Sequence, residues 1–237
     1  MIYAIIAAGE GSRLREEGIG EPKPLVGVGG ECLIDRLIRI FMNNAASEII
    51  VICNDLTSLV AAHLEKIRHD GLHGKPVPLR FIVKSTPSSM HSMYEISRWL
   101  RGGKFILTTV DTIFSETEFA RYVDAFGKSD ADGLMGVTDY IEDEKPLYVG
   151  VGDDMIVNGY YDEPHGCRYI SAGIYGLRPS AIETLEECVR NGEARMRNFQ
   201  RALLRDGRTL EAFAFTEVID IDHASDIHRA EAMLECR

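Results

Sequence analysis

The sequence predicts an α/β fold with a doubly wound, mostly parallel sheet, and three observations favour this class. Apolar runs of strand length alternate with amphipathic segments through the first half of the chain. The 237 residues suffice for a sizeable core, and 45% hydrophobic with 27% charged residues is typical of a globular protein. Glycines follow the first apolar run, as expected where a buried strand turns into a loop.

The first half is expected to form four strands separated by helices. The strands are the short apolar runs at residues 2–7, 48–53, 79–84 and 104–110. The helices are segments whose apolar residues recur on one face, at 32–44, 56–69 and 89–101. Ser115 and Glu118 have the spacing of a capping box, which predicts a further helix over 119–126. In such a sheet the ligand is expected at the carboxyl ends of the strands.

The second half is less regular. Strands are expected at 131–137, 147–151, 155–160, 169–176 and near 210–221. Helices are expected at 179–190, 195–205 and 224–235. Because no repeat or linker-like composition interrupts the chain, we expect a single domain over 1–237 with two halves, 1–130 and 131–237.

Composition excludes several classes of function. The net charge of −11, without a local basic cluster, argues against a nucleic-acid partner. No apolar stretch is long enough to span a bilayer and no basic n-region precedes the first strand, so a cytoplasmic protein without a membrane partner is expected. Five scattered cysteines without a Cys-x-x-Cys pair argue against a disulfide framework or a structural zinc site.

The loop after the first strand carries the features of a phosphate-binding site. Gly9 and Gly11 allow the backbone to turn tightly and to bring N–H groups close to phosphate oxygens. Arg13 can grip terminal phosphates through its planar fork, and Lys23 supplies a charge that stabilises a phosphoryl transition state. A dinucleotide fingerprint would need glycine at Leu14, and the Gly-Lys-Ser/Thr of a P-loop is absent.

The whole segment resembles the signature of the nucleotidyltransferase family that includes sugar-1-phosphate nucleotidylyltransferases and MobA-like NTP transferases. The matching pattern is an apolar strand, Ala-Gly-x-Gly-x-Arg-Leu and Pro-Lys-Pro-Leu, followed by Val-Gly-Val-Gly-Gly and a helix with Leu-Ile. The resemblance implies a Rossmann-like nucleotidyltransferase fold with catalytic roles for Arg13 and Lys23. It also implies a set of nucleotide-binding residues, namely Ala8, Gly9, Gly11, Ser12, Ser88 and Ser89, of which the last two lie in the loop that reads the base.

Two aspartates at strand ends match the metal-binding positions of this family. Asp111 ends the run Phe-Ile-Leu-Thr-Thr-Val-Asp, where a carboxylate opposite a phosphate loop suits Mg²⁺. Asp220, in Val-Ile-Asp-Ile-Asp, matches the second metal aspartate. Asp222 is the competing candidate, because residues two apart on a strand point to the same face. The resemblance therefore implies Mg²⁺ on Asp111 and Asp220, with Asp222 as the alternative.

Elements of the second half resemble the family's acceptor-binding segments. They contain Gly150 in Tyr-Val-Gly-Val, Glu163 in Asp-Glu-Pro, and Ser171 and Gly173 in Tyr-Ile-Ser-Ala-Gly-Ile-Tyr. Ser171 stands where the family has Asn, and the Lys that should follow Glu163 is replaced by proline. The resemblance implies that residues 1–130 bind an NTP and residues 131–237 bind the acceptor.

The function implied is Mg²⁺-dependent transfer of NMP from an NTP to a small phosphorylated acceptor, a sugar 1-phosphate above all, with release of pyrophosphate. A cytidylyltransferase for phosphocholine or a related alcohol phosphate or phosphonate is the alternative within this class. From other classes, a catalytically silent nucleotide-binding regulator and a Rossmann oxidoreductase stay open. The small polar groups at 86–92 favour CTP, UTP or dTTP over a purine nucleotide. Oligomeric state is left open, with a homo-oligomer among the expected assemblies.

Overall fold

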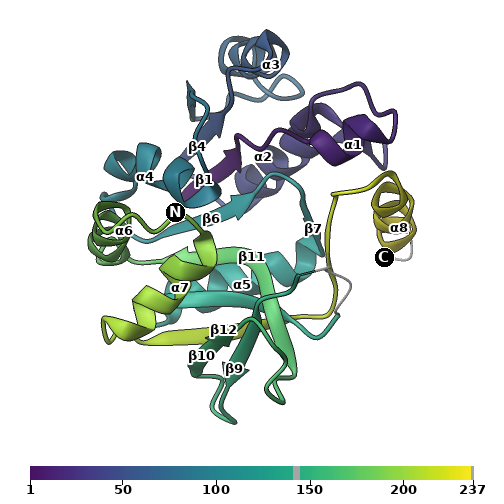
Figure 1. Cartoon of the computed structure of the whole chain (residues 1–237). Coiled ribbons are helices and arrows are strands. Elements are labelled where there is room, and N and C mark those ends of the chain that lie inside the picture. Colours follow the sequence, from purple (N-terminus) through teal and green to yellow (C-terminus); the bar gives the residue numbers. More distant parts are fainter. Residues whose placement is uncertain (141–144, 236–237) are drawn as a thin grey trace.

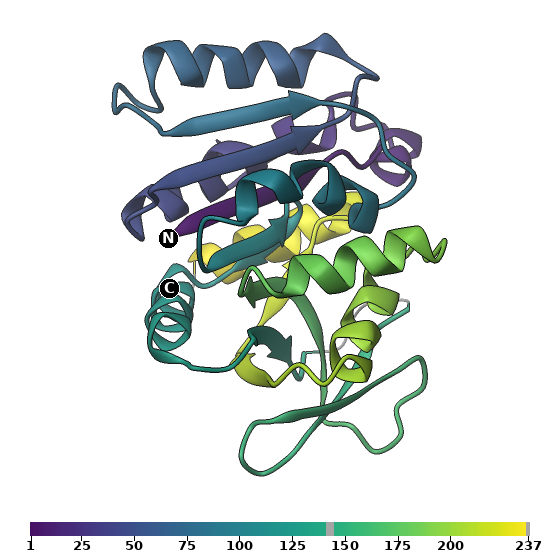
Figure 2. The same ribbon diagram turned by 90° about the vertical axis from the view of Figure 1, so that its left-hand side faces the viewer.

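The computed structural model describes residues 1–140 and 145–235, and its central element is a nine-stranded sheet. Four neighbouring strands of this sheet are parallel, in the order β6 (Phe105–Thr109), β1 (Ile2–Ala7), β4 (Glu48–Cys53) and β5 (Leu79–Val83). Each is a short apolar run that is buried on both faces or nearly so, except for the edge strand β5. Figure 2 shows these strands as a twisted stack with α3 (Ser58–Asp70) lying across it.

Helices cover both faces of the sheet, as is required because successive apolar side chains of β1 point to opposite faces. Tyr3 and Ile5 point into a core that they share with α2 (Leu33–Asn43), α3 and α5 (Glu116–Lys128). Ala4 and Ile6 point into a second core, with α4 (Ser89–Leu100), α6 (Ala181–Arg190) and α7 (Met196–Arg205). This arrangement confirms the predicted α/β fold with a central, mostly parallel sheet.

The second half extends the sheet with antiparallel pairs (Figure 1). The long strand β11 (Tyr169–Leu177) runs antiparallel to β6, to β8 (Gly133–Thr138) and, at its start, to β9 (Tyr148–Val151). β9 forms a hairpin with β10 (Val157–Tyr161), and β12 (Leu210–Phe215) lies parallel to β8. The register of β11 shifts between Ser171 and Tyr175, where Gly173 has φ 69°.

The predicted strand near 210–221 is wrong in its extent, because two separate strands occupy it. β12 ends at Phe215, and β13 (Val218–Asp220) pairs with β7 (Thr112–Phe114) in a small separate sheet. Between them, the backbone N–H and hydroxyl of Thr216 donate to the Glu118 carboxylate, which fixes the chain as it leaves the large sheet. Ser115 caps α5 as expected, since its Oγ accepts a hydrogen bond from Glu118 N at 3.4 Å.

Short elements that the sequence patterns did not predict surround the first glycine loop. They are α1 (Ser12–Glu16), the 3₁₀ turn η1 (Lys23–Leu25), and the two-residue strands β2 (Gly27–Val28) and β3 (Glu31–Cys32). The last helix, α8 (Ala224–Glu235), lies beside α1 in Figure 1, and the Glu17 carboxylate after α1 accepts a hydrogen bond from Ala224 N at 2.7 Å. The C-terminal helix is thereby brought to the loop that follows β1.

Two predictions made from composition can be compared with the described residues. None of the helices within 1–140 and 145–235 is long and apolar enough to cross a membrane. Four of the cysteines, Cys32, Cys53, Cys167 and Cys188, are free, in agreement with the absence of a disulfide framework among them, and Cys236 lies outside the described residues.

Candidate functional site

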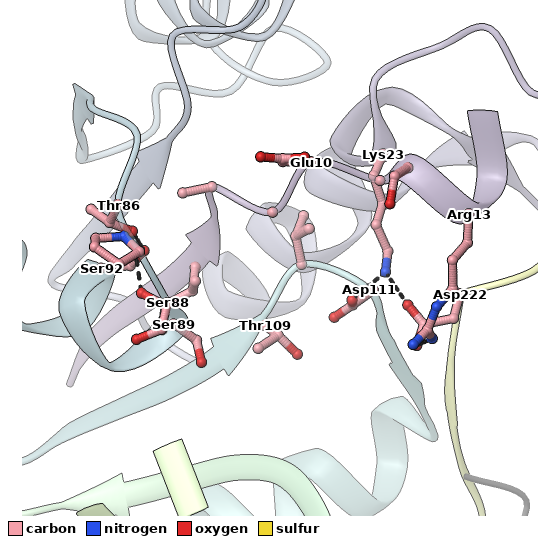
Figure 3. A pocket seen from close by; sticks show the side chains of 17 residues that line it. Glu10, Arg13, Lys23, Thr86, Ser88, Ser89, Ser92, Thr109, Asp111 and Asp222 are labelled. Atoms are coloured by element: carbon pink, nitrogen blue, oxygen red, sulfur yellow. Dashed lines mark hydrogen bonds and ion pairs between the residues drawn. The ribbon is translucent and has the colours of Figure 1, made fainter. Parts of the chain in front are cut away.

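A cavity of about 450 Å³ opens where β1, β5 and β6 end. The loops that follow these three strands form its wall, as expected for a ligand site in a parallel sheet. The cavity brings together many of the residues singled out in the sequence, namely Ala8, Gly9, Gly11, Ser12, Arg13, Lys23, Ser88, Ser89 and Asp111. Figure 3 shows Ser88 and Ser89 on one side of this cavity, and Lys23, Arg13 and Asp222 on the other.

Lys23 lies between two carboxylates and points into the cavity (Figure 3). Its Nζ is 2.5 Å from Asp111 Oδ2 and 2.7 Å from Asp222 Oδ1, and its side chain is only 9% exposed. Burial alone would lower the pKa of Lys23, but the charges and hydrogen bonds of Asp111 and Asp222 outweigh it and raise the pKa. A permanently charged ammonium group is therefore fixed at the cavity wall.

Arg13 and the glycine loop complete this side of the cavity. The Arg13 guanidinium donates to Asp222 Oδ2 at 3.0 Å and lies at the start of α1, whose N-cap is Gly11. The other flank of the loop is held by Asn54, which sequence reasoning missed: its Nδ2 donates to Gly9 O at 2.9 Å. Asn54 directly follows β4, and this position at a strand end beside β1 is the signal that could have identified it.

Three aspartates gather at the end of β6. Asp220 pairs with Thr112 across β13 and β7, and Ile221 N donates to Asp111 O at 3.0 Å, so the backbones of the two segments are fixed against each other. Asp222, the alternative metal ligand in the sequence prediction, contacts both Lys23 Nζ, at 2.7 Å, and the Arg13 guanidinium, at 3.0 Å. Its pKa is lowered: burial would raise it, but the charges of Lys23 and Arg13 act more strongly in the opposite direction.

Asp220 has the opposite electrostatic environment. Burial among protein atoms and then the charges of Asp111 and Asp222 raise its pKa, against smaller effects of Lys23 and Thr112. The Asp220 side chain is exposed to solvent in a cavity. The geometry therefore supports the charges of Asp111 and Asp222 most directly as the cause of the raised pKa. Carboxylates at this density suit a hard divalent cation, which would relieve their repulsion. The oxygen donors of Asp111, Asp220 and Asp222 therefore have the chemistry of the metal that the family resemblance implies, but in the described part of the chain their ligand atoms do not all lie within 4.8 Å of one another.

A smaller cavity of about 110 Å³ adjoins the first, and both are lined by Arg13 and Asp222. Ser171 and Asp220 line it together with the basic side chains of His223 and Arg229. Ser171 Oγ donates to Gln200 Oε1 at 3.2 Å, which ties the start of β11 to α7. Of the predicted acceptor residues, Ser171 is thus the one that borders a cavity next to the glycine loop.

The other predicted acceptor residues lie elsewhere. Gly173 packs behind the site: a Cβ there would lie 3.3 Å from Thr112 Oγ1, which is paired with Thr109 Oγ1 at 2.7 Å. Gly150 lines a third cavity, of about 630 Å³, at the β9–β10 hairpin. Glu163 is exposed and is not among the residues that line these three cavities. The structure does not bring Gly150 and Glu163 to the cavity that contains Lys23.

The loop at 86–92 also has a structural role. Ser88 is the N-cap of α4, and its Oγ accepts from His91 N at 3.4 Å and lies 2.9 Å from His91 Nδ1. Thr86 Oγ1 and Ser92 Oγ are 2.6 Å apart and close the loop. Ser89 is the first residue of α4 and lines the cavity. The hydroxyl of Ser88 is therefore occupied by the helix cap.

Comparisons with known proteins match the chain to a family and to solved structures. Residues 3–206 match the family described as the MobA-like NTP transferase domain. A curated protein of Rubrobacter xylanophilus, named bifunctional IPC transferase and DIPP synthase, is 26% identical over 244 residues, which cover 98% of this chain and 51% of that protein. The chain thus spans about half the length of this curated relative.

Two solved structures have the same fold. The inositol-1-phosphate CTP transferase from T. maritima superposes with a TM-score of 0.79 at 17% identity, over 99% of this chain and 96% of that one. A putative glucose-1-phosphate thymidylyltransferase from Bacillus anthracis, in complex with a sucrose, gives a TM-score of 0.83 at 17% identity, over 98% and 95%. The likeness extends over the whole chain in both cases.

Proposed function

The chain belongs to the MobA-like NTP transferase domain family, and from this premise we propose that it transfers the nucleotidyl group of CTP to a phosphorylated cyclic polyol, an inositol phosphate or a sugar 1-phosphate. Membership makes it a nucleotidyltransferase. The choice of CTP and of a polyol phosphate is supported by the names of an IPC transferase relative and of an inositol-1-phosphate CTP transferase with the same fold.

The observation that carries the proposal is the position of Lys23. Its ammonium group lies between Asp111 and Asp222, on the wall of a cavity that the glycine loop also lines. A charge fixed in this way needs no reorganisation when negative charge develops on a phosphoryl group. A silent nucleotide-binding regulator would not require a lysine charge fixed in this position. A Rossmann oxidoreductase would not require three carboxylates at the same point.

The transfer reaction does not need a strong general base, because the phosphate of the acceptor is already ionised at neutral pH. The residues must align an acceptor oxygen with the α-phosphorus and offset the charge of two anions. Lys23 would stabilise the transferring group, while the amides of the loop at Gly9 and Gly11 and the Arg13 guanidinium would bind the leaving pyrophosphate. Asp111 and Asp220 would hold Mg²⁺, which supplies charge neutralisation at the α-phosphate when it is bound.

The acceptor is assigned to the second half of the chain, 131–237. The smaller cavity, with Ser171 on its wall, adjoins the cavity of the glycine loop and is bordered by the cations of Arg13 and Arg229. Asp220, Asp222 and Asp226 also line this cavity, so its charge is mixed, and the two guanidinium groups are the donors that support the binding of an acceptor phosphate in a chain that lacks the Lys expected after Glu163. Gly150, Glu163 and Gly173 would act on the acceptor only indirectly. We assign the reaction to the cytoplasm, where NTPs are available.

Pyrophosphate release tests the proposal. The full chain is incubated with Mg²⁺ and each of the NTPs, against inositol 1-phosphate, a panel of sugar 1-phosphates, phosphocholine and aminoethylphosphonate. We expect release with CTP and inositol 1-phosphate or a sugar 1-phosphate. Release with phosphocholine alone would favour the alternative acceptor class, and no release with any pair would overturn the proposal.

The role of Lys23 is tested with a matched lysine. Lys23→Ala is expected to lower turnover by a factor of about 100 or more, as for the loss of a preorganised group at a developing charge. Lys128→Ala removes a lysine whose side chain is 76% exposed on α5, and should leave turnover unchanged. Full turnover in Lys23→Ala would refute the assigned mechanism, even if the substrate pair proved correct.

A further inference from the structure

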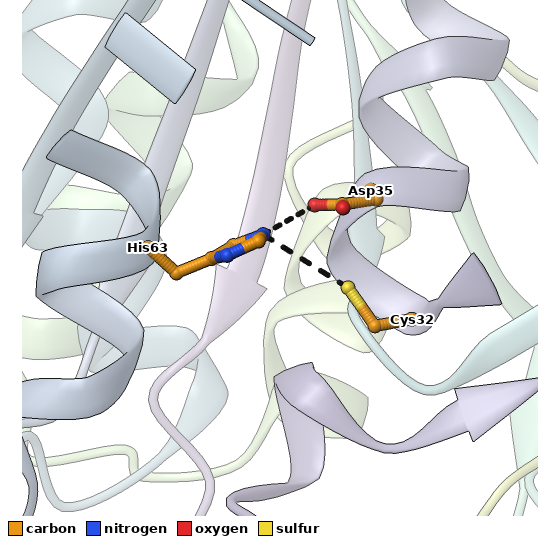
Figure 4. Close-up of side chains that lie close together, drawn as sticks. All are labelled: Cys32, Asp35 and His63. Carbon is orange, nitrogen blue, oxygen red and sulfur yellow. Dashed lines mark hydrogen bonds and ion pairs between the residues drawn. The ribbon is translucent and has the colours of Figure 1, made fainter. Parts of the chain in front are cut away.

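A second cluster of reactive side chains lies apart from the carboxylates and the glycine loop. It consists of Cys32, Asp35 and His63, which converge between α2 and α3 (Figure 4). None of the three is among the residues that line the cavities of the candidate site. The nucleotidyl transfer proposed above gives these residues no role.

Local structure explains why the three side chains meet. Cys32 is the N-cap of α2 and Asp35 lies in its first turn, three residues later, so both side chains are presented at the same end of the helix. His63 lies in the middle of α3, and α2 and α3 pack on the same face of the sheet. The cluster cannot be recognised from the spacing of residues in the sequence, because His63 is 28 residues from Asp35 and no Cys-x-x-Cys pair is present.

The hydrogen-bond pattern of the cluster differs from that of a catalytic triad. In a triad, the carboxylate and the nucleophile bind the two different nitrogens of the imidazole. Here both partners face Nε2, which is 2.6 Å from Asp35 Oδ1 and 4.0 Å from Cys32 Sγ. One ring nitrogen can donate one proton only, so it cannot serve both groups well. A cation between the three atoms would accept an electron pair from each of them.

The spacing suits a small tetrahedral ion. The three ligand atoms lie within 4.8 Å of one another. A zinc ion bound at about 2.0–2.3 Å would space them about 3.3–3.8 Å apart. The Nε2–Sγ separation of 4.0 Å therefore has to close by a few tenths of an ångström, and the short Nε2–Oδ1 hydrogen bond has to open. Both changes require the three side chains to rotate when the ion binds.

The ligand types select the metal. A thiolate and an imidazole favour zinc over Mg²⁺, which prefers oxygen ligands alone. The neighbouring carboxylate of Glu31 is engaged by the Arg39 guanidinium at 2.8–3.1 Å, so it is not counted as a ligand. The His63 side chain is 30% exposed, which leaves a path for the ion and room for a water molecule.

We propose that Cys32 Sγ, Asp35 Oδ1 and His63 Nε2 bind one Zn²⁺ ion, with a water molecule from solvent as the fourth ligand. Binding converts the Cys32 thiol to a thiolate and displaces the proton shared by His63 Nε2 and Asp35 Oδ1; both protons pass to solvent, and no electrons are transferred. The ion crosslinks α2 to α3 and thereby stabilises the layer of helices on this face of the sheet.

Metal titration of the full chain tests this site. The protein is freed of metal with a chelator, and Zn²⁺ binding is measured by competition with a chromophoric chelator in excess Mg²⁺. We expect one zinc per chain. Cys32→Ser and His63→Ala should each weaken binding more than about 100-fold, since even outer-shell changes cost about 10–100-fold. Serine is a favoured N-cap, so Cys32→Ser keeps the start of α2 intact.

Two control variants and a second metal complete the design. Cys167→Ser and His73→Ala remove a cysteine and a histidine outside the cluster, and should change zinc affinity less than about twofold. With Co²⁺ in place of zinc, a thiolate-to-cobalt charge-transfer band should appear and should vanish in Cys32→Ser. Zinc bound without this band, or with equal affinity in both ligand variants, would mean that the ion sits on the Asp111–Asp220 carboxylates. That result, or an absence of zinc binding, would overturn the proposal.

Discussion

Gly11 packs directly against Lys23. A Cβ built on Gly11 would lie 3.0 Å from Lys23 Cβ, and the backbone of Gly11 has φ 61°, a conformation that side chains disfavour. We therefore predict that Gly11→Ala both strains the loop and displaces the lysine. The left-handed conformation costs about 1–2 kcal/mol, which corresponds to a fall in Tm of about 2–8 °C for a chain of this size. Turnover should fall about 10-fold or more, because small displacements of charged groups weaken transition-state stabilisation.

Gly9→Ala is the matched control for stability. A Cβ on Gly9 meets no atom within 4 Å, and Gly9 is not among the glycines with positive φ. Its Tm should stay close to that of the natural chain, as measured by thermal unfolding of both variants. Equal losses of Tm in Gly9→Ala and Gly11→Ala would contradict the role of the Gly11–Lys23 contact.

Periodicity was sufficient to predict the parallel core of the sheet. β1 and β4 agree with the predicted strands, because buried parallel strands are short apolar runs that periodicity detects. The region near 210–221 was harder, since apolar residues recur through it at strand spacing on both sides of Thr216, although β12 and β13 belong to different sheets. Two long-range interactions separate them, namely the hydrogen bonds of Thr216 with Glu118 and the pairing of β13 with β7. Such contacts leave no local pattern in the sequence.

The candidate site was predictable where its residues belong to the glycine-loop motif or directly follow a strand. Lys23 and Asp111 were identified from sequence and are 2.5 Å apart. Asn54 was missed because an asparagine after a strand is common in turns, and only the fold brings it to Gly9. Gly150 was assigned by resemblance alone, and the β9–β10 hairpin carries it to a separate cavity. Resemblance locates a motif along the chain, but the position of a hairpin in space depends on packing.

Ser88 and Ser89 should respond differently to substitution by alanine. Ser88 caps α4, so Ser88→Ala is predicted to cost about 1 kcal/mol of unfolding free energy. Ser89 has no side-chain hydrogen bond within the described part of the chain, so Ser89→Ala should change stability by less than about 0.5 kcal/mol. If Ser89 contacts the nucleotide, Ser89→Ala raises the KM for CTP. Denaturant unfolding and steady-state kinetics measure the two effects, and a stability loss confined to Ser89→Ala would contradict this division.

Glu116 should contribute to stability in a pH-dependent way. Its hydrogen bonds with Arg39 are the largest cause that lowers its pKa below the ordinary 4.5; burial opposes them, and the charges of Arg39 and Arg36 lower the pKa further. A lowered folded-state pKa stabilises the protein above the unfolded pKa, and this contribution disappears as the pH falls through the folded value. We predict that Glu116→Gln loses about 1 kcal/mol at pH 7, since the glutamate is 39% exposed and screened but also faces the buried Arg36.

The difference between Glu116→Gln and the natural chain should shrink below about pH 4. Urea unfolding at several pH values measures it. Glu65→Gln serves as the control, because Glu65 is 53% exposed and its ion pair among the described residues is with the exposed Arg68, so its loss should cost less than about 0.5 kcal/mol. A difference for Glu116→Gln that grew towards low pH would show that the ion pair is not its cause.

Asp220 and Asp222 should contribute to different properties, Asp222 to the stability of the fold and Asp220 to metal binding. Asp222 accepts hydrogen bonds from Lys23 and Arg13, so Asp222→Asn deprives the buried lysine of one partner and should cost about 1 kcal/mol. Asp220 is repelled by the two neighbouring carboxylates, so Asp220→Asn should leave stability unchanged or raise it. As the proposed second metal ligand, Asp220 sets the Mg²⁺ requirement.

We therefore predict that Asp220→Asn raises the Mg²⁺ concentration for half-maximal turnover about 10-fold or more, whereas Asp222→Asn mainly lowers turnover at saturating Mg²⁺. Metal titrations of pyrophosphate release, together with thermal unfolding of the same preparations, distinguish the two variants. The reverse pattern, a higher Mg²⁺ requirement in Asp222→Asn alone, would assign the second ligand to Asp222. In that case both metal ligands, Asp111 and Asp222, would be carboxylates that also contact Lys23 Nζ, at 2.5 and 2.7 Å, and the repulsion between the ion and the ammonium group would move Lys23 when the metal binds.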